Sequence, residues 1–346
     1  MPEIELVNIR KTYGRIIAID RVNLHVNDGE YMAVIGPSGC GKSTLLKVIS
    51  GIVEPDEGDV LVDGESILGK PPEERNIGFI FQDLALFPHM NGFENAGYGL
   101  RVREWDPRDA DHEVLELARE FGFNVELARF PEEMSSGEQQ QVALLRAIAY
   151  GAKILLLDEP LSAIDRKVSE EVREKLRRIV KSKGLTALHV THNQEEAMAV
   201  ADRIAVMRRG RFVQVGTPQE LYYNPLTPFV MAFVGDASFL VGRTENGKVV
   251  VRGGYEIGPS NLPEGELLVV GIRPENVVFG TGIPGRIRLR SYLGAFLRYE
   301  IELVNGDVII AVTEEELEGK DVKVWFSGYK LFRFPEEGLS EAILPG

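Results

Sequence analysis

The sequence contains a single cysteine, Cys40, and no long hydrophobic run. One cysteine excludes an internal disulfide and any metal site built from cysteine ligands. No segment of about 18 consecutive apolar residues occurs, which argues against a membrane-spanning helix. The first residues, MPEIELVNIRKTYG, have no apolar core behind a basic head, so no secretory signal is visible. These absences predict a cytoplasmic protein.

Basic residues are too few for a general nucleic-acid binder. The chain has 39 Lys and Arg against 53 Asp and Glu, a formal net charge of −14, whereas phosphate neutralisation needs a basic face. A composition of 44% hydrophobic and 27% charged residues is typical of a globular protein. With 346 residues the chain is too long for one ordinary core, so we expect two domains, with room for a third subdomain.

A glycine-rich loop follows a short apolar segment near the amino terminus. The segment Tyr31–Ile35 reads as a strand, and the helical pattern LLKVISG follows the loop. Strand, loop and helix occur in the order of a phosphate-binding P-loop. The residues predicted to bind ATP in this loop are Gly36, Pro37, Ser38, Gly39, Cys40, Gly41, Lys42, Ser43 and Thr44.

The residue types in this loop suit a phosphate ligand. Glycines let backbone N–H groups approach phosphate oxygens, and the following helix adds the positive end of its dipole. We expect Lys42 to reach the β- and γ-phosphates and the Ser43 hydroxyl to bind Mg²⁺. The alternative is a glycine turn without a ligand. Cys40 is interpreted as a small tolerated residue; alternatively, Lys42 and the helix terminus lower its pKa and make it sensitive to alkylation.

A second candidate motif is KILLLDEP at Lys153–Pro160. Apolar residues before two carboxylates predict a buried parallel strand that delivers acids to a ligand site. We expect Asp158 to hold Mg²⁺ through its water shell, and Glu159 to orient or deprotonate the attacking water. Alone the pattern is weak evidence, but together with the P-loop it indicates an ATP-hydrolysing site.

These motifs resemble the nucleotide-binding subunit of an ABC transporter over roughly residues 3–235, and the resemblance implies further roles. Tyr13 stands where that family has an aromatic that stacks on adenine; the alternative is a tyrosine that packs on the core. Gln82 matches a glutamine that touches Mg²⁺ and the water and links the core to a helical subdomain. His192 matches a histidine that contacts the γ-phosphate. Asp165, at the end of SAID, resembles part of the loop that crosses the dimer interface.

The segment MSSGEQQQ, at Met134–Gln141, lies where the family carries LSGGQ before a helix. By resemblance, Ser135 donates its hydroxyl to the γ-phosphate bound by a partner subunit, with the Gly137 N–H and the helix dipole assisting. The alternative is a structural helix cap by Ser135 or Ser136, with Glu138 in the first turn. Both interpretations can hold, because they use the same free N–H groups.

This signature departs from the family pattern in two ways. Ser136 replaces a glycine, which adds a Cβ where backbone lies close to phosphate. Glu138 replaces glutamine, which adds negative charge near an anionic ligand. Asn193 also replaces the usual acid after the histidine, and Ile164 the usual leucine. We still expect hydrolysis, at a low basal rate, either in a homodimer or in a pair with a second ATPase that supplies a better signature.

The expected fold class is α/β. By resemblance, residues 1–235 form a P-loop NTPase core with an antiparallel β subdomain and a helical subdomain at about residues 88–150. The strands IELVNI and RVNLHV alternate in polarity as an antiparallel pair does. The apolar run Leu84–Phe93 is expected to line the groove that receives a helix from a membrane subunit.

Residues 236–346 are rich in short β segments punctuated by Gly and Pro, which predicts a small all-β, OB-like barrel. The region resembles the regulatory and dimerisation barrel of importers for sugars, polyamines, iron, sulfate and molybdate, and GIRPENV at Gly271–Val277 fits that group. An oligonucleotide-binding barrel is the alternative, since Arg286, Arg288 and Arg290 alternate on one strand. The region nevertheless has 12 basic and 17 acidic residues, which favours a dimer salt-bridge face or an anionic regulator.

The resemblance implies an import ATPase that hydrolyses MgATP at a dimer interface on the inner face of the membrane. Its partners would be a second copy or a second ATPase, integral permease subunits and an external solute-binding protein, with no nucleic acid. The transported solute is expected to be a sugar or a small ion or polyamine. The alternatives are a non-transport ABC ATPase, which would carry long coiled coils or two cassettes in one chain, and a regulator with a vestigial ATPase.

Overall fold

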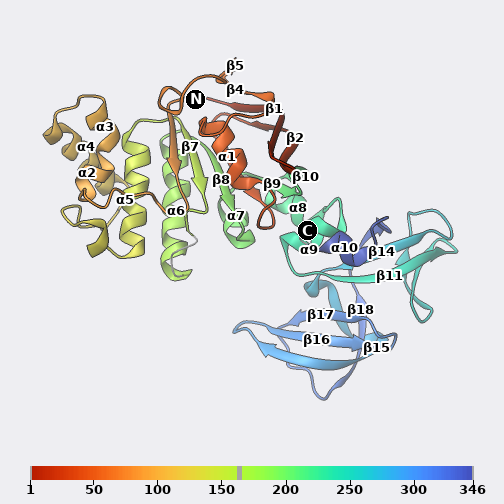
Figure 1. The fold of residues 1–346 in the computed structure, drawn as a ribbon. Coiled ribbons are helices and arrows are strands. Elements are labelled where there is room, and N and C mark those ends of the chain that lie inside the picture. Colours follow the sequence, from red (N-terminus) through yellow and green to blue (C-terminus); the bar gives the residue numbers. More distant parts are fainter. Residues whose placement is uncertain (1, 162–165, 345–346) are drawn as a thin grey trace. The chain divides into compact units, whose positions relative to one another are not determined.

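The computed structural model describes residues 2–161 and 166–344, and the chain divides into two compact units between Pro218 and Gln219 (Figure 1). This division falls before the change in sequence texture at residue 235. The intervening segment contains α8 (Pro218–Tyr223) and α9 (Pro228–Val234). Met231 of α9 is buried with Val269 and Phe332, so α9 packs with the second unit. No helix in the described ranges is long and apolar enough to cross a membrane.

The first unit is built on a six-stranded sheet. Its strands run in the order β10 (Arg211–Gly216), β9 (Arg203–Arg208), β3 (Tyr31–Ile35), β8 (Thr186–Thr191), β7 (Ile154–Asp158) and β6 (Ile77–Ile80). All pairs are parallel except β10 with β9. Every residue of β3, β7 and β8 is buried, which explains their continuous apolar character. The loops after these three strands therefore meet at one edge of the sheet.

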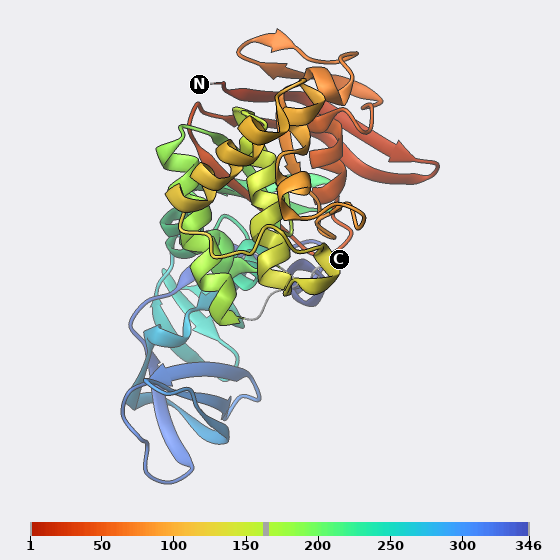
Figure 2. The same cartoon turned by 90° about the vertical axis from the view of Figure 1, so that its left-hand side faces the viewer.

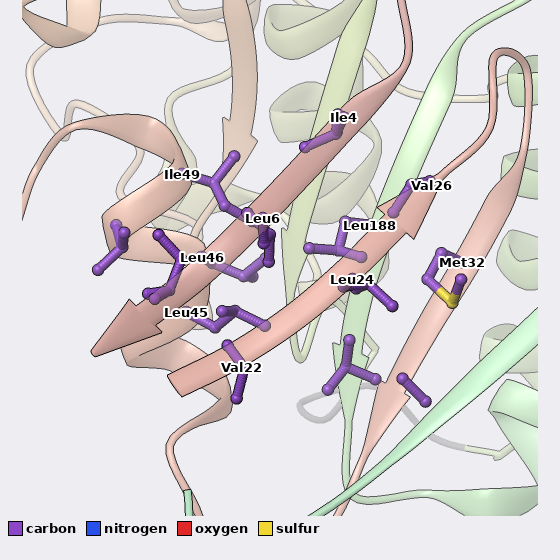
Figure 3. Packing of buried hydrophobic residues seen from close by; sticks show 14 of the residues in the cluster. Ile4, Leu6, Val22, Leu24, Val26, Met32, Leu45, Leu46, Ile49 and Leu188 are labelled. Carbon is purple, nitrogen blue, oxygen red and sulfur yellow. The ribbon is translucent and has the colours of Figure 1, made fainter. Parts of the chain in front are cut away.

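A second, antiparallel sheet covers the P-loop helix. Its strands run in the order β2 (Ile16–Val26), β1 (Ile4–Tyr13), β4 (Glu57–Val62) and β5 (Glu65–Ser66), which confirms the predicted antiparallel pairing. Figure 3 shows Leu6 of β1, Leu46 of α1 (Lys42–Ser50) and Leu188 of β8 among the side chains that fill one apolar cluster. Each such fully buried side chain contributes about 1.5–3 kcal/mol, so this cluster fixes α1 behind the phosphate loop.

The remaining helices of the first unit form two groups. A helical subdomain, coloured orange to yellow in Figure 2, contains α2 (Gly92–Ala96), α3 (Tyr98–Val102), α4 (Pro107–Glu120) and α5 (Ser136–Ala149). Helices α6 (Arg166–Ser182) and α7 (Gln194–Val200) accompany the parallel sheet, and single 3₁₀ turns lie at η1 (Pro72–Glu74) and η2 (Pro131–Glu133). The helical insertion predicted near residues 88–150 is thus present in the structure.

The second unit contains two antiparallel sheets that share one apolar core. One runs β13 (Tyr255–Pro259), β12 (Lys248–Val251), β11 (Ser238–Glu245), β14 (Leu267–Ile272) and β19 (Lys330–Arg333); the other runs β17 (Val308–Thr313), β16 (Leu297–Leu303), β15 (Val277–Tyr292) and β18 (Asp321–Phe326). The turn η3 (Pro274–Asn276) precedes β15, and α10 (Leu339–Ile343) follows β19. The all-β prediction for this region is confirmed.

The arginines of β15 do not continue one strictly alternating row. A register shift lies between Ile287 and Leu289, so Arg286 is opposite Glu302 whereas Arg290 is opposite Tyr299, which is buried. Regular alternation would place the three arginines on one face of the strand, but the bulge reverses the alternation after Ile287 and breaks this row. Arg288 forms an ion pair with Glu302 and Arg290 forms one with Glu316.

Candidate nucleotide-binding site

The loop between β3 and α1 is closely packed against the chain around it. A Cβ on Gly36 would lie 2.3 Å from the Met207 backbone oxygen, and one on Gly41 would lie 2.1 Å from that of Ala18. Gly41 also has φ of 110°, which disfavours a side chain. Because Gly41 is the N-cap of α1 and has no side chain, the first N–H groups of this helix are left for an external acceptor such as phosphate.

Cys40 is buried in this loop, with 5% of its surface exposed. Burial raises the pKa of its thiol, and the neighbouring Lys42 lowers it less. The interpretation of Cys40 as an activated, alkylation-sensitive thiol is therefore wrong, and the small tolerated residue is what the structure supports.

Lys42 supplies a cation inside the loop. Only 6% of its surface is exposed, and its Nζ donates to the carbonyl oxygens of Gly36 at 2.7 Å and Pro37 at 2.9 Å. These acceptors are neutral, and within the described residues no carboxylate forms an ion pair with the ammonium group. Phosphate oxygens are stronger acceptors for an ammonium group, so the arrangement fits an anionic ligand in the loop.

Ser43 and Asp158 meet at the carboxyl ends of β3 and β7. The Ser43 hydroxyl donates to Asp158 Oδ1 at 2.9 Å. Burial raises the pKa of Asp158, and the hydrogen bond from Ser43 opposes that shift. A hydroxyl oxygen and a buried carboxylate side by side are oxygen donors of the kind that Mg²⁺ prefers, so these residues fit the predicted metal ligands.

Gln82 and His192 both lie beside Glu159, the residue predicted to orient or deprotonate the attacking water. Its carboxylate lies 3.0 Å from His192 Nδ1 and 3.4 Å from Gln82 Nε2. The Glu159 backbone N–H donates to Val190 of β8, and its φ is 47°. A left-handed conformation in a residue with a Cβ is strained and occurs often at functional sites. This backbone conformation was not predicted from the sequence.

Tyr13 ends β1 and is exposed rather than packed in the core. Its relative exposure is 47%, which counts against the core-packing alternative. The Nζ of Lys11 lies 5.8 Å from the ring centroid. An exposed aromatic face at the end of a strand is suited to stacking on a nucleotide base.

The signature segment forms a reciprocal cap on α5. The Glu138 carboxylate accepts from the Ser135 N–H and from the Ser135 hydroxyl, both at 2.8 Å, while the Glu138 N–H donates to Ser135 Oγ at 3.3 Å. The structural cap is thus confirmed, and Glu138 holds the hydroxyl that the resemblance assigns to the partner's nucleotide. Gly137 is buried in the first turn. Asp165 and the rest of SAID lie outside the described residues.

A buried polar network, which was not predicted from the sequence, links β3, β8 and α7. The Tyr31 hydroxyl lies 3.0 Å from His189 Nδ1, and His189 Nε2 lies 3.3 Å from Glu196. Glu196 also accepts from the Thr191 hydroxyl at 2.7 Å. The signal was present as polar residues inside the apolar strand of β8, whose side chains need partners once buried.

A groove of about 350 Å³ lies between β6, α3 and α5. It is lined by Pro72, Glu73, Ile77, Gly78, Phe79, Tyr98, Gly99, Val102, Arg146, Ala147 and Tyr150. The edge strand β6 and two helices form most of this lining. The prediction that Leu84–Phe93 lines the groove for a membrane-subunit helix stays a prediction, and this segment is absent from the lining of the groove described here. That segment only borders it: the ring centroids of Phe87 and Tyr98 are 4.8 Å apart.

Comparisons with known proteins agree with this geometry. The ABC transporter family matches residues 19–162 and the TOBE domain family matches residues 270–334. The sulfate/thiosulfate import ATP-binding protein CysA 1 of Chromobacterium violaceum is 39% identical over 310 residues, 86% of each chain. The spermidine/putrescine import ATP-binding protein PotA 1 of Pseudomonas aeruginosa is 39% identical over 326 residues, 88% of each chain.

Solved structures resemble the first part of the chain. A bacterial ABC transporter cassette in a dimeric structure has a TM-score of 0.57 and 31% identity, covering 62% of this chain and 98% of the cassette. A post-hydrolysis state bound to ADP and Pi has a TM-score of 0.57 and 30% identity, with the same coverage. The relatives extend across most of both chains, and so the protein belongs to the ABC transporter family, as an import ATP-binding subunit with a carboxy-terminal TOBE domain.

Proposed function

We propose that two copies of this chain enclose two MgATP molecules and that each site is completed by both copies. The observation that carries the proposal is the convergence of Gln82 and His192 on Glu159, beside the Ser43–Asp158 pair. In this assignment Glu159 accepts the proton of the attacking water, while His192 orients that carboxylate and contacts the γ-phosphate. Lys42 exchanges its loop carbonyls for phosphate oxygens.

We include Mg²⁺ in the proposal because oxygen-bearing side chains that could bind it lie together at the site. Ser43 and Asp158 would hold Mg²⁺, with Gln82 completing the set from the following loop. A bound Mg²⁺ neutralises charge that develops on the phosphate oxygens. The chain's own contribution is to keep the Asp158 carboxylate buried and pointed at the Ser43 hydroxyl.

The second half of each site would come from Ser135, Gly137 and Asp165 of the partner copy. The Ser135 hydroxyl is exposed on α5, but it donates to Glu138 in the isolated chain. It must therefore change partner when the copies close on ATP. We infer that closure is weaker than in a signature with a neutral residue at position 138, which gives a low basal rate.

Import requires membrane partners, and the groove between β6, α3 and α5 is the surface we assign to them. We propose that it receives a helix from integral permease subunits, which place this chain on the cytoplasmic face of the membrane. The exposed apolar side chains of Tyr98 and Val102 at the groove suit such a helix. An external solute-binding protein would deliver the cargo. Nucleic acid is not a proposed partner, because Arg288 and Arg290 are ion-paired within the chain.

The solute is proposed to be a small ion or a polyamine. The relatives reported above are named for sulfate and thiosulfate or for spermidine and putrescine, which favours these cargoes over the sugar that the sequence left open. In this assignment specificity resides in the permease and the solute-binding protein. Thermal unfolding of the partner binding protein with sulfate, thiosulfate, spermidine and putrescine would identify the cargo.

The assembly can be tested by tagging this chain in its native cell and solubilising the membranes gently in MgATP. Co-purification with permease subunits and no second ATPase supports the homodimer. Recovery of a second ATPase would show an asymmetric pair instead. Recovery of neither would contradict the import assignment.

A further inference from the structure

The segment after Gln82 contains a strained turn. Leu84 has φ of 59° and Ala85 has φ of 43°, two consecutive non-glycine residues in the left-handed region. Such a conformation is unfavourable for a residue with a Cβ and persists only where surrounding contacts hold it. Leu84 is buried, whereas Ala85 is exposed, so packing of the Ala85 side chain does not hold this turn.

The Leu84 N–H donates to the Phe81 carbonyl at 2.9 Å, and Arg146 supplies the side-chain hydrogen bonds to the turn. Its Nη1 donates to the Ala85 carbonyl at 2.7 Å and its Nη2 donates to the Leu84 carbonyl at 2.6 Å. The guanidinium also lies 5.7 Å from the ring centroid of Phe87. Two parallel donors in a rigid fork fix both carbonyl directions at once, which a single ammonium cannot do.

Arg146 therefore connects elements that take part in the proposed reaction. It lies on α5, the helix capped by Ser135, and it lines the groove between β6, α3 and α5. The turn that it holds begins two residues after Gln82, whose amide lies 3.4 Å from the Glu159 carboxylate. A shift of this turn would move the Gln82 backbone relative to Glu159.

We propose that Arg146 is a positioning residue, which keeps Leu84 and Ala85 left-handed and thereby places Gln82 against Glu159. The proposal rests on the proposed function, because it assigns Gln82 and Glu159 to hydrolysis. It predicts an effect on turnover rather than on nucleotide affinity, since Arg146 touches neither the phosphate loop nor Tyr13.

The test is steady-state ATP hydrolysis by the full-length Arg146→Ala variant. We expect kcat to fall by about 10- to 100-fold, because small displacements of reacting groups cost that much, with KM for ATP near the parental value. The matched control is Arg103→Ala. Arg103 also stacks on an aromatic, Tyr150, at 4.0 Å and donates to a backbone carbonyl, but it does not contact the turn. Its kcat should stay close to that of the parent.

A rescue variant separates positioning from general destabilisation. Glycine adopts positive φ without the Cβ penalty, so Ala85→Gly in the Arg146→Ala background should recover several-fold of the lost kcat. Ala85→Gly alone should be nearly neutral. If Arg146→Ala does not fold, Arg146→Lys keeps the charge without the fork, and it should show the same loss and the same rescue.

The outcomes distinguish this inference from the proposed function. Glu159→Gln, which removes the proposed base, serves as the control for the proposed function and should be inactive. If it is inactive, the role of Arg146 would be overturned by an unchanged kcat in Arg146→Ala, by an equal loss in Arg103→Ala, or by no recovery with Ala85→Gly. If Glu159→Gln hydrolyses ATP as fast as the parent, the proposed function itself fails.

Discussion

Ser43 and Asp158 are 115 residues apart in the chain, and a hydrogen bond of 2.9 Å joins their side chains. The bond exists because two parallel strands, β3 and β7, end at the same edge of one sheet with β8 between them. A helix amino terminus thus faces a buried carboxylate across the phosphate loop. This single relationship connects the two motifs of the sequence in space.

Asp158→Asn should separate stability from activity. Burial raises the pKa of Asp158, so its contribution to stability is complete below the pKa of the unfolded chain and is lost as pH rises through the higher folded-state pKa. Asparagine removes the buried charge but keeps an oxygen for the Ser43 hydroxyl. At neutral pH the ligand-free variant should unfold at a higher temperature than the parent, while Mg²⁺-dependent hydrolysis falls by at least about 100-fold.

Asp158→Ala is the control for this experiment, because it removes the acceptor as well as the charge. It should be less stable than Asp158→Asn and equally inactive. Parental turnover in Asp158→Asn would remove this residue from the metal site.

Tyr13→Ala should weaken ATP binding without slowing the bound complex. A stacked aromatic is worth about 1–3 kcal/mol per base, so KM for ATP should rise by roughly 5- to 150-fold with kcat nearly unchanged. Tyr13→Phe keeps the aromatic face and should behave like the parent. The KM for GTP should rise by a similar factor, since stacking does not depend on the hydrogen-bonding groups at the edges of the base. A fall in kcat with unchanged KM would argue against a base contact.

The positions of several residues of this site could be predicted from local sequence patterns. The apolar runs of β3 and β7 predict buried parallel strands, and strand ends fix where Lys42 and Asp158 lie. The left-handed Glu159 and the contact between Arg146 and Ala85 could not be predicted, because each depends on backbone geometry set by distant segments.

In the second unit, too, features that depend on distant segments could not be predicted from the sequence. Alternating residues indicate its strands, but the bulge after Ile287 shifts the arginines relative to one another. The packing of Met231 against β14 and β19 likewise assigns α9 to this unit, although its sequence texture does not. Register and packing partners are long-range properties, so a pattern along the chain does not fix them.

Glu138→Gln should raise ATP-dependent closure and turnover. Glutamine preserves the reciprocal cap with Ser135 but removes a negative charge beside the proposed γ-phosphate position. Even in water-like surroundings one charge at about 4 Å is worth roughly 1 kcal/mol, which corresponds to about fivefold. Sedimentation with ATP and a hydrolysis assay would measure both effects. Glu138→Ala, which breaks the cap, is the control and should reduce helix stability. Slower turnover in Glu138→Gln than in the parent would contradict this role.

Cys40 should be protected in the folded protein. Burial raises the pKa of its thiol, and the thiolate is the reactive form. Alkylation by iodoacetamide at neutral pH should therefore be at least about tenfold slower in the native state than in urea, as followed by intact-mass spectrometry. Equal rates in both states would show an exposed thiol, contrary to the packed phosphate loop.

The most direct measurement is the oligomeric state and ATP turnover of Glu159→Gln beside the parent, each with MgATP. If Glu159 is the base between two copies, the variant should lose about 10²- to 10⁴-fold in turnover and accumulate as an ATP-bound dimer, while the parent hydrolyses ATP and returns to the monomer. Parental turnover in Glu159→Gln, or a Glu159→Gln variant that stays monomeric under saturating MgATP, would contradict hydrolysis by Glu159 between two copies of the chain.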